Sequence, residues 1–162
     1  MKLCMSTLLR MSGRVLAAAV LGLLAGCGNE PKQPAEVTFA LTGNDQMKFS
    51  KERFEVDAPT KLTVQFQNVG SMPKVSMGHN FVLLKKGVDV LEFSADCISA
   101  GPVAENEYLP EKMREQVLAW TKVLGPNEEA SLTVELTEPG TYAYVCTFPG
   151  HFANMKGVVV VK

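Results

Sequence analysis

Histidine is scarce in this sequence. Only His79 and His151 occur among 162 residues, so no site that needs three or more imidazoles fits in the chain. There is also no run of lysine or arginine, and the formal net charge is -1, which argues against a nucleic-acid surface. No internal repeat or low-complexity tract is present, and an apolar content of 46% is ordinary for a folded protein. We therefore expect a single globular domain.

The N-terminus has the pattern of an export signal. An apolar stretch at 15–25 follows several basic residues and is too short to span a bilayer. It ends Leu24-Ala25-Gly26-Cys27, which resembles the lipobox of bacterial lipoproteins, in which the cysteine is lipidated and becomes the first residue. We predict a lipoprotein signal peptide at 1–26 and a lipid anchor at Cys27. A signal peptide without lipid is the alternative.

The segment that follows is typical of a tether. Residues 28–35 contain two prolines and no apolar anchor, so 27–35 is predicted to be the lipidated cysteine and a short, extended linker. We expect the folded domain at 36–162, in the periplasm and held at the membrane by its lipid. Gly28, in place of an aspartate after the cysteine, favours the outer membrane.

Most of the domain has the periodicity of β-strands. Apolar and polar residues alternate at 37–41, 62–66 and 132–136, which predicts strands with one buried face. Further strands are expected at 79–84, 117–124, 140–146 and 157–162, with Gly, Pro, Asn and Asp marking the turns between them. Seven or eight short strands predict an all-β sandwich.

Only 89–100 fits a helix in this pattern. Its expected apolar positions are Val90, Leu91 and Phe93, followed by Cys97 and Ile98. We therefore predict one short helical insertion in the sandwich.

A cluster of sulfur and imidazole groups lies near the C-terminus. Cys146, His151 and Met155 are spaced Cys-x4-His-x3-Met. A His2Cys set with a distant methionine marks an electron-transfer copper site, and the second imidazole must then come from His79. Zinc also binds Cys and His, but closed structural zinc sites favour two or more thiolates. We therefore expect copper.

The remaining cysteines permit two interpretations. Cys4 leaves with the signal peptide and Cys27 goes to lipid, so the folded domain keeps Cys97 and Cys146. In an exported protein such a pair suggests a disulfide. If Cys146 binds metal, Cys97 is instead a small buried apolar residue, which we favour.

The motifs together resemble the azurin-like members of the cupredoxin family. They are Met77-Gly78-His79-Asn80, Cys146-Thr147-Phe148-Pro149-Gly150-His151 with Met155, and Gly43-Asn44-Asp45-Gln46-Met47. The resemblance covers 36–162 and implies an eight-stranded Greek-key sandwich with one type 1 copper. It makes His79, Cys146 and His151 the equatorial ligands, and places the Met155 sulfur and the Gly78 carbonyl at long axial distance.

The resemblance also implies roles for residues around the metal. Asn80, Thr147 and Phe148 are expected next to the ligands, where Asn80 ties the two ligand segments together. An apolar patch for brief contacts with redox partners would surround His151. Its expected members are Met47, Met72, Met77, Phe148, Pro149 and Gly150. The alternative is an ordinary loop cluster with some exposed apolar atoms.

Two departures from the family limit what the resemblance implies. The cysteines of the family's disulfide are absent, since Val37 and Thr60 or Lys61 stand in their places. Asn68 stands where many relatives carry a pH-sensitive buried histidine, so proton-linked tuning of the copper potential by that route should be absent.

These observations favour a single-electron carrier that exchanges electrons with redox proteins of the cell envelope, as a monomer. A copper delivery module is the alternative. A copper enzyme would need a second metal centre, and no histidine remains to build one. We therefore predict that the protein is not an enzyme.

Overall fold

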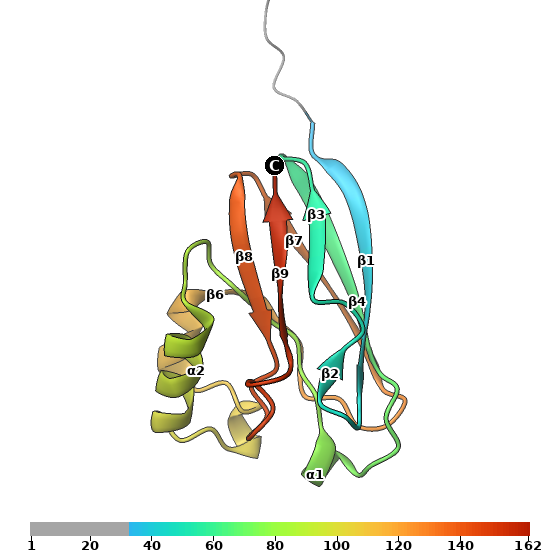
Figure 1. Ribbon diagram of the computed structural model, residues 1–162, viewed down its shortest axis with the longest axis vertical. Coiled ribbons are helices and arrows are strands. Elements are labelled where there is room, and N and C mark those ends of the chain that lie inside the picture. The colour runs from blue at the N-terminus through green and yellow to red at the C-terminus, as the bar shows by residue number, and fades with distance from the viewer. Residues whose placement is uncertain (1–32) are drawn as a thin grey trace, which may run out of the picture. The chain divides into compact units, whose positions relative to one another are not determined.

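The computed structural model describes residues 33–162, so the predicted signal peptide and Cys27 lie outside the described residues. The described part is built mainly from β-strands, drawn in Figure 1. In chain order they are β1 (Ala35–Asn44), β2 (Lys48–Phe49), β3 (Arg53–Val56), β4 (Thr60–Asn68), β5 (Val82–Leu84), β6 (Val117–Trp120), β7 (Glu129–Leu136), β8 (Gly140–Val145) and β9 (Lys156–Val161). β1 begins one residue before the predicted start of the domain.

The strands form two sheets that pack into a sandwich. One has the order β2-β1-β4-β7 and the other β3-β9-β8-β5-β6. Neighbours such as β1 and β4, or β5 and β8, are far apart in the chain, and the pairs β1–β4 and β3–β9 run parallel. The predicted all-β sandwich is confirmed.

Alternation along β1 and β4 builds one side of the core. Phe39 and Leu41 of β1 are buried, as are Leu62, Val64 and Phe66 of β4, while the residues between them face outward or are half-buried. Because β1 and β4 pair in register, with Phe39 opposite Val64, these side chains form one continuous apolar face.

β5 and β8 lack this alternation because both of their faces are covered. Leu83 and Tyr144 belong to the core between the sheets, whereas Val82 and Val145 pack in a second apolar cluster on the outer face. Helix α2 (Val90–Ser99) covers that outer face and contributes Phe93. A short run that is apolar throughout is the expected sequence of a strand buried on both sides.

The predicted helical insertion is confirmed, but its apolar face differs from the prediction. Asp89 caps α2, accepting hydrogen bonds from the main-chain nitrogens of Leu91 (2.8 Å) and Glu92 (2.9 Å). Phe93 and Cys97 are buried as expected. Leu91 and Ile98, which were expected to be apolar positions of the same kind, are exposed.

Two further predictions about elements were wrong. The helical insertion is not the only helix, because the described residues also contain α1 (Lys74–Met77) and the 3-10 helices η1 (Ala104–Asn106) and η2 (Glu111–Gln116). Each is too short to show a helical period. The strand expected at 79–84 begins only at Val82, and His79 is held by a single bridge to Leu124. Among residues 33–162, no helix is long and apolar enough to cross a membrane.

Candidate metal centre

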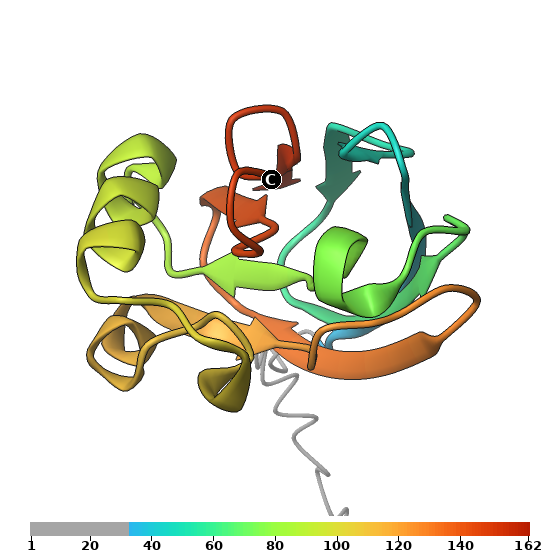
Figure 2. The ribbon, with the colours of Figure 1, turned by 90° about the horizontal axis from the view of Figure 1, so that it is seen from below.

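Two segments carry the predicted ligands to one end of the sandwich. Seen from that end, the loop between β8 and β9 lies between α2 and α1 (Figure 2). Cys146 directly follows β8, and Met155 directly precedes β9. Both ends of this ligand loop, residues 146–155, are therefore fixed by neighbouring strands of one sheet.

Hydrogen bonds within the ligand loop hold its shape. The Cys146 main-chain nitrogen donates to the Met155 carbonyl (3.0 Å), and the Met155 nitrogen donates to the His151 carbonyl (2.9 Å). The His151 nitrogen donates to the Phe148 carbonyl (3.1 Å). Gly150 has a φ of 82°, in the left-handed region that glycine adopts most easily. These protein hydrogen bonds thus close the loop without help from a metal ion.

His79 reaches the site from the other segment. Its nitrogen donates to the Leu124 carbonyl (3.1 Å), and the Leu124 nitrogen donates back to the His79 carbonyl (2.7 Å). The preceding Gly78 is needed for space, because a Cβ there would lie 2.5 Å from Val123 Cγ1 and 2.7 Å from the Lys74 carbonyl oxygen. Any larger residue would push His79 away from its place.

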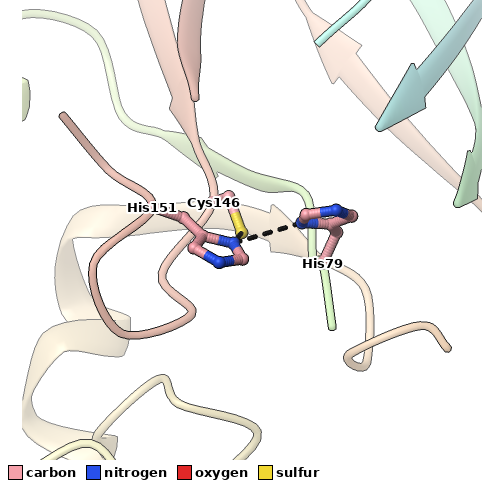
Figure 3. Close-up of side chains that lie close together, drawn as sticks. All are labelled: His79, Cys146 and His151. Atoms are coloured by element: carbon pink, nitrogen blue, oxygen red, sulfur yellow. Dashed lines mark hydrogen bonds between the residues drawn. The ribbon is translucent and has the colours of Figure 1, made fainter. Parts of the chain in front are cut away.

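The three predicted equatorial ligands converge. His79 Nδ1 lies 3.2 Å from His151 Nδ1, which in turn lies 3.7 Å from Cys146 Sγ (Figure 3). The ligand atoms of all three residues lie within 4.8 Å of one another. Two imidazole nitrogens that bind one ion at about 2.0–2.1 Å cannot be more than about 4.2 Å apart, so the two histidines fit a shared metal.

The site is closed to solvent. His79 and Cys146 are fully buried, and only 2% of His151 is exposed. The predicted patch would therefore surround a covered imidazole. The ligand loop exposes Pro149, Gly150, Ala153 and Asn154 instead of the imidazole.

Burial sets the protonation of the metal-free ligands. It lowers the pKa of His151 to about 4, with a smaller contribution from nearby His79, and it also lowers the pKa of His79. Both rings are therefore neutral at pH 7 and offer a lone pair. Burial raises the pKa of the Cys146 thiol to about 12. The main-chain N–H groups of Asn80 and Phe148 favour the thiolate and oppose this rise, but their effect is smaller. A bound cation reverses this balance and deprotonates the thiol.

The second ring nitrogen of His79 is less well satisfied. His79 Nε2 is buried and has no partner of normal hydrogen-bond geometry among the described residues. The Asn44 main chain nevertheless lies close enough to oppose the lowering of the His79 pKa. A ligating histidine normally donates its other N–H, and the Asn44 main chain is the neighbour of His79 that favours this.

Asn80 ties the two ligand segments together. Its side-chain nitrogen donates to Thr147 Oγ1 (2.8 Å), and its side-chain oxygen accepts from the Thr147 nitrogen (2.8 Å). The same side-chain nitrogen also donates to the Glu107 carbonyl (3.1 Å). Asn80 and Thr147 are both buried, so water could not satisfy either side chain if these hydrogen bonds were lost.

Met155 also lies at the site. Its side chain is fully buried. Its methyl carbon and His79 Cδ2 lie 2.6 and 3.2 Å from the position that a Cβ on Gly43 would occupy. The thioether thus packs beside His79, and the adjoining Gly43 leaves room for both side chains.

The members of the predicted partner patch differ in exposure. Met72, Pro149 and Gly150 are exposed, and Met47 and Met77 are half-buried. Phe148 is only 6% exposed, because its ring packs against those of His151 and Tyr108, each with centroids 4.7 Å apart. Phe148 therefore does not form an exposed contact surface, whereas Val75, which the prediction omitted, is 85% exposed.

Two supporting residues were missed by sequence reasoning. Glu107 offers its carbonyl to Asn80, and its carboxylate accepts a hydrogen bond from the Val123 nitrogen (2.7 Å). Tyr108 covers Phe148. Both have a φ of 56°, in a region that non-glycine residues seldom adopt. No motif in the sequence marks them.

Cys97 lies apart from the metal centre. Cys97 and Cys146 are both free thiols, so the disulfide alternative was wrong. Cys97 is buried in the apolar cluster beneath α2, and burial raises its pKa to about 11. Asn68 is buried as well, and it donates to the Leu124 carbonyl (3.0 Å) and accepts from the Gly70 nitrogen (2.9 Å).

Comparison with known proteins agrees with this geometry. Azurin from Pseudomonas fluorescens biotype B is 38% identical over 132 residues, covering 79% of this chain and all of the relative. Azurin from Bordetella pertussis is 39% identical over 133 residues, covering 80% of this chain and 86% of the relative.

Solved structures show the same likeness. Dithionite-reduced auracyanin from Roseiflexus castenholzii superposes with a TM-score of 0.67 at 34% identity, covering 79% of this chain and 98% of the other. Azurin Az-iso2 from Methylomonas sp. strain J gives a TM-score of 0.65 at 32% identity, with the same coverage.

Residues 35–162 match the family described as copper binding proteins, plastocyanin/azurin family. The donor set points to the same metal, because a buried thiolate with two imidazoles suits one type 1 copper ion. The chain belongs to the plastocyanin/azurin family of copper-binding proteins, with His79, Cys146 and His151 grouped at its copper site.

Proposed function

We propose that this protein carries single electrons between redox partners of the bacterial cell envelope and catalyses no reaction of its own. One observation carries the proposal: three buried ligand atoms from two distant segments already lie within 4.8 Å of one another. In this proposal His79, Cys146 and His151 would hold the ion, and Met155 and the Gly78 carbonyl would bind it more weakly. A bound copper ion supplies the couple between Cu(I) and Cu(II).

The protein's part is to keep the ligands where they are in both oxidation states. The Asn80–Thr147 bonds fix the two segments relative to each other, and the bond between Cys146 and Met155 closes the loop. A thiolate and two imidazoles suit both oxidation states, so little has to move when an electron passes. Burial keeps water from adding as a ligand.

Reconstitution with copper tests this function. The metal-free protein should take up one equivalent of Cu(II) and become intensely blue. A mild reductant should bleach the colour, and a mild oxidant should restore it, with copper retained throughout. Release of copper on reduction, or its transfer to a copper-accepting chelator much weaker than the site, would support a delivery module and contradict the carrier.

We also propose that the carrier is an exported lipoprotein, tethered through Cys27 in the periplasm. The lipobox-like end of the leader supports this, and the likeness to azurins is compatible with it. Mass spectrometry of the mature protein should show a diacylglyceryl-modified Cys27 as the first residue, and Cys27→Ser should release the protein from membranes. A mature protein that starts elsewhere and carries no lipid would contradict the anchor.

A further inference from the structure

A cavity of about 220 Å³ opens between α2 and the ligand loop. Cys97 and Ile98 line it on the helix side, and Phe148, Pro149 and Phe152 line it on the loop side. The ligand loop lies between α2 and α1 in both ribbon views (Figures 1 and 2). Neither Met72 nor Met77 lines the cavity.

The chemistry of this cavity selects an apolar occupant. Its lining is mostly carbon, and the polar side chains within it already have partners. Ser94 Oγ donates to the Val90 carbonyl (2.6 Å), Thr147 Oγ1 accepts from Asn80, and Cys97 Sγ lies 3.6 Å from the Tyr108 carbonyl oxygen. A cavity of about 150 Å³ is enough to bind benzene, so one aromatic or branched side chain fits here.

The cavity also lies close to the copper ligands. Phe148 lines it and packs against His151, with ring centroids 4.7 Å apart. A group seated in the cavity would thus be separated from a copper ligand by a single aromatic ring. This short path would suit electron exchange.

The helical segment that supplies one side of the cavity is strongly acidic. The helical segment 89–116 contains seven Asp and Glu against two basic residues, whereas the rest of the described chain has nine acidic and ten basic residues. Ion pairs in residues 33–162 involve four of the acidic residues outside this segment and none inside it. Asp89 and Glu107 accept main-chain hydrogen bonds. The other five carboxylates are free of ion pairs among the described residues, so they can meet a positively charged partner and would repel a second copy of the same face.

We propose that this cavity is a docking point for a redox protein that presents an apolar side chain within a basic surface. An apolar anchor in a pocket, surrounded by complementary charge, is the usual plan of a specific protein contact. The exposed Ile98 and Val103 extend the apolar area beyond the cavity. The inference rests on the proposed electron-carrier function and adds to it the class of partner and a contact site on the α2 side of the ligand loop, which shares Phe148, Pro149 and Gly150 with the predicted patch.

Three peptides test the chemistry of the site against the diamagnetic Cu(I) protein. They are Lys-Lys-Trp-Lys-Lys, Glu-Glu-Trp-Glu-Glu and Lys-Lys-Gly-Lys-Lys, each titrated while amide chemical shifts are followed by NMR. The first should shift the amides of residues 94–98 and 147–152, and added salt should weaken the effect. The other two should bind at least about fivefold more weakly, because each lacks either the charge or the anchor.

Variants locate the contact. Ile98→Trp should fill the mouth of the cavity and weaken binding of Lys-Lys-Trp-Lys-Lys about tenfold. Leu91→Trp is its control, because Leu91 is also exposed on α2 (59%, against 51% for Ile98) but does not line the cavity. The double change Asp96→Lys with Glu105→Lys should weaken binding severalfold. The control is Glu129→Lys with Glu135→Lys, on exposed positions of β7. It makes the same change in net charge and should not weaken binding of the peptide severalfold.

Several results would overturn the proposal. Equal binding of both Trp peptides would make the cavity a site for neutral aromatic groups without regard to charge. Shifts centred on Met72 and Met77, or none at all, would remove it as a docking point. Voltammetry on the same sample separates the two claims: a reversible copper couple without peptide binding would leave the carrier function standing, and an irreversible couple would contradict that function whatever the peptides do.

Discussion

The ligand loop and the helical segment 89–116 adjoin each other but are built in opposite ways. In the loop, main-chain hydrogen bonds and buried side chains account for almost every polar group near the ligands. In the helical segment, carboxylates have no basic partner among the described residues, and Leu91 and Ile98 are exposed. The comparison shows where the chain maintains a fixed geometry and where it presents a surface.

The two cysteines give the largest test of this contrast. Cys146→Ser should abolish the blue colour, because the thiolate is the ligand that produces it and serine cannot replace it. Cys97→Ala should leave the spectrum unchanged and lower the free energy of unfolding by about 1–2 kcal/mol, as expected for a small core deletion. Absorption spectra and urea unfolding report the two effects. Loss of colour in Cys97→Ala would place Cys97 at the metal.

Asn80 is the next largest test, because it joins the two ligand segments. Asn80→Ala would leave Thr147 without its side-chain partners in a buried place, which should cost about 2–3 kcal/mol of unfolding free energy. Asn154→Ala, on an exposed position of the same loop, should change it by less than about 0.5 kcal/mol. Equal effects in urea unfolding would mean that Asn80 does not tie the segments together.

The cap of α2 probes the helical segment in the same way. Asp89→Ala removes the acceptor for two main-chain nitrogens and should destabilise the protein by about 1 kcal/mol, whereas Asp89→Asn should lose much less. Neither change should alter the absorption spectrum, since α2 carries no ligand. A spectral change in Asp89→Ala would show that the two regions are coupled more tightly than their contacts indicate.

The smallest effect is expected at Met77, the last residue of α1. Met77→Glu places a charge on the predicted patch, where Met77 is half-buried. It should slow electron self-exchange between oxidised and reduced protein, measured by NMR line broadening, while the spectrum stays the same. An unchanged exchange rate would count against the patch and leave the α2 cavity as the remaining candidate face.

The ligand loop could be predicted from sequence because its chemistry is local. Cys146, His151 and Met155 lie within ten residues, and the scarcity of histidine assigned His79 to the same site. The sandwich was predictable as well, since β1 and β4 follow a simple two-residue period. In both cases the pattern that gives the prediction lies within a short stretch of sequence.

What sequence reasoning missed depends on contacts between distant segments. The exposed Leu91 and Ile98 have the composition of a buried helix face, and only packing decides which side of α2 meets the sheet. Phe148 was expected at the surface, but Tyr108 covers it from a segment with no regular pattern. Glu107 supports the site through its main-chain carbonyl. Every residue has this group, so the identity of residue 107 does not indicate the contact.

Amide hydrogen exchange on the metal-free protein tests most directly whether the protein itself holds the ligands in place. The amides of Cys146, Thr147 and Met155 donate to Met155, Asn80 and His151, respectively. They should stay protected without copper, nearly as well as the amides of β8. Exchange of these three at unfolded-chain rates until copper is added would show that the metal builds the site, and would contradict the account.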